Sequence, residues 1–204
     1  MFNVCPKCGM YAVEKEIRGN IAVCPYCGGE IRFRKLPLFI LTGPCGVGKS
    51  TVSGLVSAMT DRVVVLESDI LWEQRWNTPE NKYRPFRELW LRMCKNISQA
   101  GKPCLLCGCA DPGQFEPCDE RRYFDEIHYL ALVADPEVLA ARLRGRPEWR
   151  QTHDDGFIAG QVAYDRWFID HHGETNPPIE LLDTTDLTPE ETAARVLRWL
   201  EEKM

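Results

Sequence analysis

Residues 43 to 50 read Gly43-Pro44-Cys45-Gly46-Val47-Gly48-Lys49-Ser50, between an apolar run (38–41) and a helical pattern that extends to about Met59. In this strand–loop–helix setting the motif can bind phosphate, because glycines let consecutive backbone N–H groups turn inward and the helix start adds partial positive charge. We expect Lys49 to reach the β- and γ-phosphates and the Ser50 hydroxyl to bind Mg²⁺. The alternative is a glycine-rich turn with a chance lysine. The stretch therefore predicts a nucleoside triphosphate site.

The length and composition describe an ordinary globular protein with room for one α/β domain and a small second part. The chain has 204 residues, of which 44% are hydrophobic and 27% charged. Its first residues lack a basic segment followed by an apolar core, and no apolar stretch approaches membrane-spanning length, so we expect a cytoplasmic protein. Residues 1–35 hold six Lys/Arg and three Asp/Glu, whereas the remainder holds 19 and 27. An acidic body of this kind argues against broad nucleic-acid binding.

Two cysteine pairs lie close to the amino terminus, Cys5-Pro6-Lys7-Cys8 and Cys24-Pro25-Tyr26-Cys27. Their C-x2-C-x15-C-x2-C spacing predicts four thiolate ligands for a structural Zn²⁺ ion, and a redox dithiol pair is the alternative. We expect a short hairpin that pairs residues 10–13 with residues 21–23. Residues 1–35 resemble the zinc ribbons of many bacterial proteins. So small a segment would draw most of its folding free energy from the metal.

The rest of the chain, 36–204, alternates apolar strands with helical patterns. This alternation predicts an α/β fold with a parallel sheet, helices on both faces and a ligand beyond the carboxyl ends of the strands. A helix over about 84–99 would bury one face and end at Gly101. The residues of that face are Phe86, Leu89, Trp90, Met93 and Ile97. The expected strands cover 38–42, 62–66, 102–107, 127–133 and 179–182, and further helices cover 136–144 and 189–202.

Four arginines fall within residues 142–150, where Gly145 and Pro147 interrupt the helical pattern. We interpret the segment around 142–156 as a lid that brings guanidinium groups over the phosphates and excludes water. Arg142 and Arg146 lie four residues apart and would share a face while the helix lasts. A solvated basic helix end is the alternative.

Glu67-Ser68-Asp69 follows the second strand. Alternation along a strand places Glu67 and Asp69 on the same side, toward the phosphate site. One carboxylate would hold the waters of Mg²⁺ while the other accepts the proton of an attacking hydroxyl. Ordinary capping of the next helix is the alternative.

Residues 37–203 resemble the small-molecule and nucleotide kinases of the P-loop proteins, the group that includes adenylate, shikimate and gluconate kinases. The resemblance rests on the loop 43–50, Asp69, the segment 142–150 and Leu182-Asp183-Thr184-Thr185. It implies a three-layer P-loop NTPase fold whose five-stranded parallel sheet has the first strand at its centre. It also implies ATP and Mg²⁺ as cofactors and a small acceptor. The catalytic residues would be Lys49, Asp69, Arg142 and Arg146, and the nucleotide-binding residues Gly43, Cys45, Gly46, Val47, Gly48, Lys49, Ser50, Thr51 and, beside the adenine, Asp183.

The sequence also departs from the nucleotide-kinase pattern. Its third strand ends Cys107-Gly108-Cys109-Ala110-Asp111-Pro112, and no arginine follows before Arg121. This favours a small-molecule acceptor over a nucleotide. The segment 72–88 would cover the acceptor, with Trp72, Arg75, Trp76, Tyr83, Arg84 and Arg87 for stacking and for an anionic group.

Two other classes remain as alternatives. A GTPase switch lacks its base-reading motif, since Asn81-Lys82-Tyr83-Arg84 has no aspartate. An ATP-binding sensor or adaptor would dock a protein or nucleic-acid partner through the zinc ribbon, which also offers a surface for self-association. Fold by itself does not decide among these functions.

Overall fold

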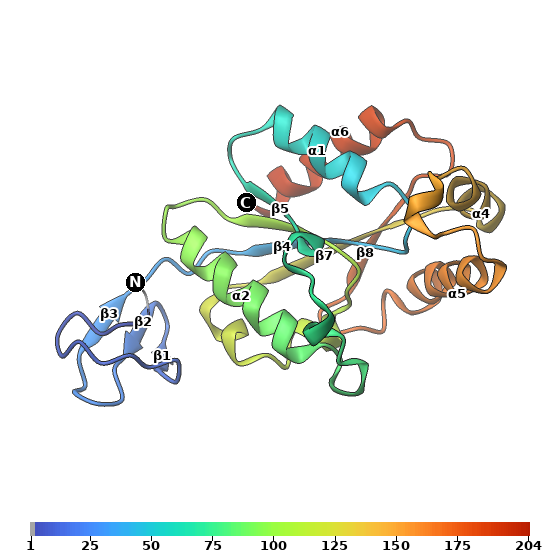
Figure 1. Cartoon of the computed structure of the whole chain (residues 1–204). Coiled ribbons are helices and arrows are strands. Elements are labelled where there is room, and N and C mark those ends of the chain that lie inside the picture. The colour runs from blue at the N-terminus through green and yellow to red at the C-terminus, as the bar shows by residue number, and fades with distance from the viewer. Residues whose placement is uncertain (1–2) are drawn as a thin grey trace.

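The computed structural model describes residues 3–204, which form two sheets of different kind. A small antiparallel sheet holds β1 (Glu16–Arg18), β2 (Ile21–Val23) and β3 (Glu30–Arg32). A five-stranded parallel sheet comes after it in the chain, with the order β5-β6-β4-β7-β8. Figure 1 shows the small sheet at one end of the larger one.

The parallel sheet confirms the expected α/β fold, with the first strand of the body at its centre. Its strands are β4 (Leu38–Thr42), β5 (Val64–Glu67), β6 (Cys104–Cys107), β7 (Ile127–Val133) and β8 (Ile179–Asp183). All five residues of β4 are buried, because helices cover both faces of the strand. Leu38 and Ile40 pack into the core on one face, and Phe39 and Leu41 into the core on the other.

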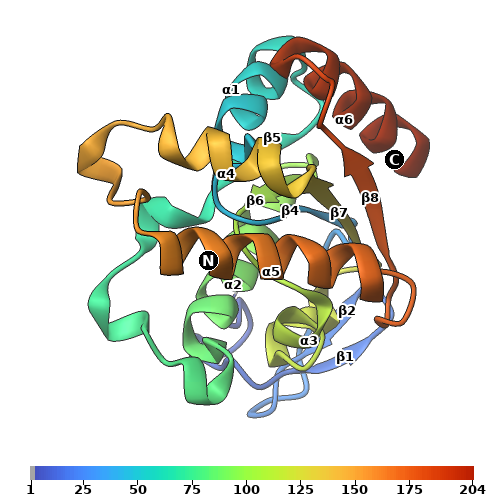
Figure 2. The same cartoon turned by 90° about the vertical axis from the view of Figure 1, so that its right-hand side faces the viewer.

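Helices form a layer on each face of this sheet (Figures 1 and 2). On one side lie α1 (Lys49–Met59) and α6 (Pro189–Lys203), which contact each other closely. On the other side lie α2 (Arg84–Ser98), α3 (Pro112–Phe115) and α5 (Asp155–His171). Helix α4 (Pro136–Arg144) stands at the carboxyl edge and packs against α5.

Short 3-10 turns complete the connections, and several bear on the site. They are η1 (Ser68–Leu71), η2 (Gln74–Trp76), η3 (Pro79–Asn81), η4 (Asp119–Tyr123) and η5 (Glu148–Arg150). Helix starts obey local sequence signals: Asp135 caps α4 with its side chain, and Thr188 forms a capping box with Glu191 before α6.

The hairpin expected in the amino-terminal part is wrong. The residues that pair with β2 are Glu16–Arg18, not 10–13, and β3 adds a third strand that was not expected. Met10 and Tyr11 are exposed, and Tyr11 forms only an isolated bridge with Val4. The tight turn at Gly19 and Asn20 lets the residues on either side of it pair directly, starting with Arg18 and Ile21. A search for apolar runs does not detect a strand such as Glu16–Arg18, because two of its three residues are charged.

The buried face of α2 also differs from the expected one. Phe86 and Trp90 are buried as expected, whereas Leu89, Met93 and Ile97 are only partly buried. The residues buried in addition are Arg87, Leu91, Cys94, Lys95 and Ser98. The helix is turned so that polar groups face a cavity and the small sheet, and an apolar pattern cannot reveal partners of that kind.

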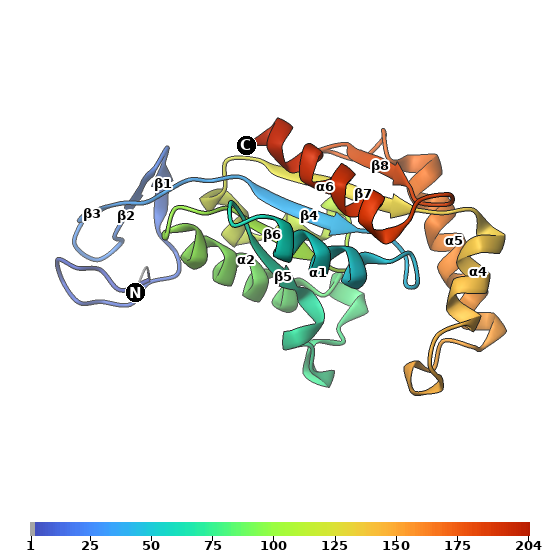
Figure 3. The same cartoon turned by 90° about the horizontal axis from the view of Figure 1, so that it is seen from above.

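The small sheet lies at the amino end of the parallel strands, and the loop after β4 lies at the carboxyl end (Figure 3). The length of β4 therefore separates the cysteine-rich part from the phosphate-loop motif. No helix within residues 3–204 is both long and apolar enough to cross a membrane.

Candidate active site

The loop between β4 and α1 has the curled backbone that an anion site requires. Gly43, Gly46 and Gly48 have φ angles of 130°, 88° and 107°, a region that L side chains rarely adopt. A Cβ atom on Gly43 would lie 2.3 Å from the carbonyl oxygen of Leu132, so only glycine fits there. Lys49 Nζ donates to the carbonyl oxygens of Gly43 and Pro44, both at 2.8 Å, which holds the ammonium group across the loop.

A cavity of about 280 Å³ opens over this loop, and we refer to it as the phosphate cavity after the phosphate-loop motif that forms its floor. Arg146 and Arg150 line it from the segment after α4, and Arg146 Nη1 lies 3.2 Å from Cys45 Sγ. A helix start and three cationic side chains, Lys49, Arg146 and Arg150, favour a polyanion such as a polyphosphate. The cavity is lined by Cys45, Gly46, Gly48, Lys49, Ser50, Thr51, Glu67, Asp69, Cys107, Gly108, Cys109, Arg146 and Arg150.

Two carboxylates and a hydroxyl supply oxygen donors on the opposite wall. Glu67 closes β5, Asp69 lies just beyond it in η1, and both line the same cavity as Ser50, as the sequence predicted. Glu67 Oε1 accepts a hydrogen bond of 3.1 Å from Ser53, and Asp69 Oδ1 accepts one of 3.2 Å from Ser68. Hydroxyl and carboxylate oxygens are what Mg²⁺ prefers, so these residues fit that ion.

Arg142 does not lie with the other two arginines. Helix α4 ends at Arg144, and the turn at Gly145 breaks the face that Arg142 and Arg146 were expected to share. Arg142 instead donates to Thr184 Oγ1 at 3.0 Å and to the Thr184 carbonyl at 2.8 Å. It therefore reaches the loop after β8 rather than the phosphate cavity.

A second small cavity, of about 190 Å³, lies on that side of the loop. Val47 and Leu187 give it apolar walls, while Arg142 and Thr184 give it polar ones. Asp183 lies just outside, where its Oδ1 accepts from the Thr185 amide and hydroxyl at 2.8 and 2.6 Å. The lining combines apolar and polar side chains, as sites for flat heterocycles do.

A cavity of about 640 Å³ adjoins the phosphate cavity. Asp69 and Cys109 line both cavities and so stand at their common boundary. Lys82 and Tyr83 have positive φ angles of 57° and 58° at the start of α2, a strained conformation of the kind often found beside functional sites. The lining residues are Ser68, Asp69, Trp72, Asn77, Tyr83, Phe86, Arg87, Cys109, Asp111, Gln114 and Tyr164.

Arg87 is the buried cation of this large cavity, with 6% of its surface exposed. Its Nε donates to Gln114 Oε1 at 3.0 Å and its Nη2 to the Cys109 carbonyl at 2.8 Å, both neutral acceptors. Among the described residues no carboxylate forms an ion pair with it, and burial lowers its pKa. The charge of Asp111, which lines the same cavity, offsets only part of the effect of burial, so the environment favours an anionic ligand group next to Arg87.

Burial also affects two other groups of the large cavity. It raises the pKa of the Asp111 carboxyl and of the Tyr164 hydroxyl. Tyr164 reaches the cavity from α5, across from the aromatic residues Trp72, Tyr83 and Phe86. The cavity therefore combines flat apolar walls with a few ionisable groups, as small-molecule sites do.

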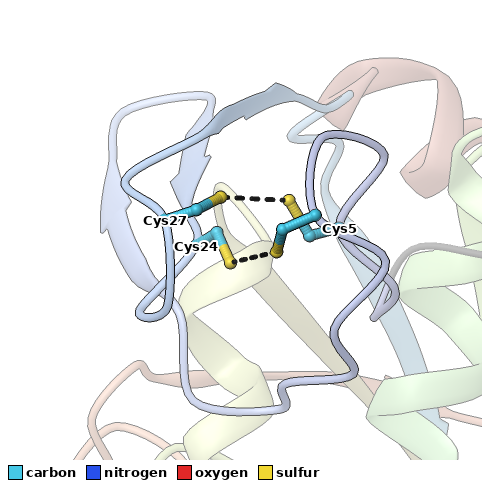
Figure 4. A group of neighbouring side chains, drawn as sticks. Cys5, Cys24 and Cys27 are labelled. Atoms are coloured by element: carbon cyan, nitrogen blue, oxygen red, sulfur yellow. Dashed lines mark hydrogen bonds between the residues drawn. The ribbon is translucent and has the colours of Figure 1, made fainter.

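The four amino-terminal cysteines converge in the way the sequence predicted (Figure 4). The sulfur atoms of Cys5 and Cys27 are 3.7 Å apart and those of Cys8 and Cys24 3.8 Å, and all four lie within 4.8 Å of one another. Four sulfurs at 2.3 Å from a tetrahedral Zn²⁺ ion would be about 3.8 Å apart. The residues therefore fit a zinc ion with no open coordination position.

The structure thus brings most of the predicted residues together and adds some. Trp72, Tyr83 and Arg87 line the 640 Å³ cavity, whereas Arg75 pairs with Glu73 and Arg84 with Glu88. Tyr164 and Gln114 were not singled out from the sequence as site residues. Nothing local distinguishes them, because long-range folding alone brings α3 and α5 to α2.

Fold and site together define a P-loop nucleotide-binding protein of the three-layer α/β type. Residues 40–162 match the family AAA_18, described as an AAA domain, and the chain belongs to that family. A comparison with curated proteins gave no match.

Solved structures share the fold. A sugar kinase from Janibacter sp. HTCC2649 is 20% identical, with a TM-score of 0.57, over 82% of this chain and 95% of the other. The tunicamycin resistance protein of Deinococcus radiodurans is 18% identical, also with a TM-score of 0.57, over 82% and 96%. Shikimate kinase from Acinetobacter baumannii, in complex with shikimate, is 16% identical, with a TM-score of 0.54, over 82% and 94%. At these identities the similarity establishes the fold alone.

Proposed function

We propose that the protein is an ATP-dependent phosphotransferase that moves the γ-phosphate of ATP to a hydroxyl group of a small acceptor. The observation that carries the proposal is the shared boundary of the two cavities. Asp69 lines both the phosphate cavity and the 640 Å³ cavity, so one carboxylate would face a donor phosphate in the first and an acceptor in the second. The kinase names among proteins of the same fold agree with it.

The reaction would use residues on both sides of this boundary. Asp69 would take the proton of the acceptor hydroxyl. The oxygen of that hydroxyl would form a bond to the γ-phosphorus, while the bond between the γ-phosphorus and the β-phosphate oxygen breaks and ADP leaves. Lys49 and Arg146 would stabilise the charge on the transferring group. Ser50, with Glu67 close by, would hold Mg²⁺, which when bound neutralises phosphate charge.

The nucleotide base would occupy the small cavity beside Val47, between Arg142 and Leu187. In this proposal Arg142 contacts the base rather than the transferring phosphate, and Arg146 and Arg150 serve the phosphates. Asp183 would order the loop that carries Thr184 through its hydrogen bonds to Thr185.

The acceptor would carry an anionic group in addition to its hydroxyl. Arg87 is buried, donates only to neutral hydrogen-bond acceptors and has the charge of Asp111 in the same cavity, so a carboxylate or phosphate of the ligand would add to the counter-charge. Trp72 and Tyr164 would enclose the apolar part of a compact molecule. Sugar acids and hydroxy acids have this combination of groups.

The test is ADP production from Mg·ATP with a panel of sugar acids, hydroxy acids, amino sugars, nucleosides and nucleoside monophosphates. The Lys49→Ala variant serves as the blank. We expect an anionic hydroxyl compound to raise turnover far above the rate without acceptor. ATP binding without turnover on any compound would overturn the proposal and support an ATP-binding sensor or adaptor.

A further inference from the structure

The amino-terminal ribbon (residues 3–35) is joined to the body through buried polar groups rather than through a flexible link. Asn3 and Lys15 from the ribbon, Lys95 from α2 and Glu120 from η4 are each at most 6% exposed. Lys95 Nζ donates to Glu120 Oε2 at 2.5 Å and to Asn3 Oδ1 at 3.1 Å. Lys15 Nζ donates to the Asn3 carbonyl at 3.0 Å. Buried charges so arranged require both parts to keep fixed positions.

The ribbon also completes its apolar core with a residue of the body. Ala22 and Phe33 pack against Tyr123 of η4, and the Phe33 and Tyr123 rings meet edge to face at 5.6 Å. The carbonyl oxygen of Val13 accepts from Arg122 Nη2 at 3.1 Å and from the Tyr123 hydroxyl at 3.4 Å. A ribbon that unfolds would therefore release η4 as well as α2.

Helix α2 continues from this contact to the 640 Å³ cavity, in which the acceptor is proposed to bind. Arg87, which lines the cavity, precedes Lys95 by eight residues, or about 12 Å along the helix axis at 1.5 Å per residue. Between them Trp90 Nε1 donates to the Ser68 carbonyl at 3.2 Å, next to Asp69. A shift of α2 would thus move the buried cation and the carboxylate-bearing turn together.

The second contacted element leads to the same cavity. Glu88 on α2 accepts hydrogen bonds from the amides of Asp119 and Glu120 at 2.6 and 3.0 Å, which fixes η4 against the helix. Upstream of η4 in the chain, Gln114 on α3 lines the cavity and accepts from Arg87. The ribbon therefore contacts α2, which carries Arg87, and η4, which follows the α3 residue that accepts from the Arg87 guanidinium.

We propose that the metal-loaded ribbon is a positioning element for the acceptor site. By holding Lys95 and η4 it would fix α2, and through α2 it would fix Arg87. The loop between β4 and α1, at the opposite end of the sheet from the ribbon, would be independent of it. The catalytic part of this inference rests on the proposed phosphotransfer. Its mechanical part concerns the ribbon and α2 alone and can be measured without an acceptor.

The experiment uses the full chain and compares wild type with Asn3→Ala, which removes the side-chain link to Lys95. Asn20→Ala, an exposed asparagine of the same ribbon, is the matched control. A third sample is wild type whose thiolate-bound metal has been removed with a chelator and then restored with Zn²⁺. Amide hydrogen exchange is followed in α2 and η4, with α1 as internal reference, together with nucleotide affinity.

We expect faster exchange in α2 and η4, but not in α1, in Asn3→Ala and in the metal-depleted protein. Added Zn²⁺ should reverse the effect of depletion. With an acceptor in hand, its KM should rise about fivefold in Asn3→Ala, with nucleotide affinity unchanged. A purely structural role would lower kcat and overall stability without separating the acceptor KM from the nucleotide affinity.

Unchanged α2 exchange in both samples would overturn the inference, because the ribbon would then have no hold on the helix. Equal acceleration in α1 and α2 would overturn it too, since that pattern means general loss of stability. Faster α2 exchange in a protein that phosphorylates no compound would leave the ribbon's hold established and refute the proposed function instead.

Discussion

Replacing Asp165 by asparagine should change how the stability of the protein depends on pH. Asp165 lies on α5 with 1% of its surface exposed. Its Oδ1 accepts from the Ala134 amide at 3.3 Å, whereas Oδ2 has no hydrogen-bond partner within the described structure. Burial raises the pKa of this carboxyl from 3.8 to about 6, and the charge of Asp183 nearby adds to the rise.

The raised pKa determines both the sign and the size of the effect. Below pH 3.8 the carboxyl is neutral in the folded and the unfolded chain, and its ionisation has no effect on stability. As pH rises from 3.8 to about 6 the unfolded chain ionises first, so the folded state loses stability, and above that range the whole penalty remains. A difference of about two pKa units corresponds to about 3 kcal/mol, and screening at the polar strand ends reduces it to about 1–2 kcal/mol.

The assay is urea unfolding of wild type and Asp165→Asn between about pH 4 and 7.5, monitored by tryptophan fluorescence. Asparagine keeps the acceptor for Ala134 and cannot ionise. The difference in unfolding free energy between the two proteins should move by about 1–2 kcal/mol in favour of the variant across that range. Protonation of the cysteine ligands affects both proteins equally and cancels. A difference that is constant with pH would refute the reasoning.

Three further variants test the site. Lys49→Met should lower turnover by about a hundredfold or more while circular dichroism stays unchanged, since charge at the transferring phosphate is lost; near-normal turnover would contradict its role. Arg87→Met should raise acceptor KM about tenfold or more and leave ATP affinity unchanged in titration calorimetry, with Arg75→Met as an exposed control. Gly43→Ala should abolish nucleotide binding and destabilise the fold by about 2 kcal/mol or more in urea, because its Cβ meets the Leu132 carbonyl.

The sequence predicted the body of the fold well because its three central strands, β6, β4 and β7, are buried on both faces. Continuous apolar runs such as 38–41 and 127–133 have few other interpretations, and the loop 43–50 requires a strand before it and a helix after it. Cysteine spacing likewise predicted the four-sulfur cluster, since the ligands lie in two local pairs. In each case the decisive signal lies within a few neighbouring residues.

Predictions that needed tertiary information were weaker. The apolar pattern of α2 could not show that Lys95 faces a buried glutamate or that Arg87 faces a cavity. Arg142 reaches from its helix to the loop after β8, a contact made across 42 positions of the chain. Tyr164 reaches the acceptor side only because α5 packs across the sheet from a distant part of the sequence.

The buried Lys95–Glu120 pair has a consequence for anyone who wishes to work with the body alone. A protein shortened to begin at residue 36 would lose Asn3 and Lys15 and open the pair, together with the ring of Tyr123, to water. The shortened protein would expose to solvent a surface of apolar and charged groups that is buried in the full chain. We therefore expect that removal or exchange of the ribbon lowers the stability of the body, even though the sequence places a domain boundary at residue 35.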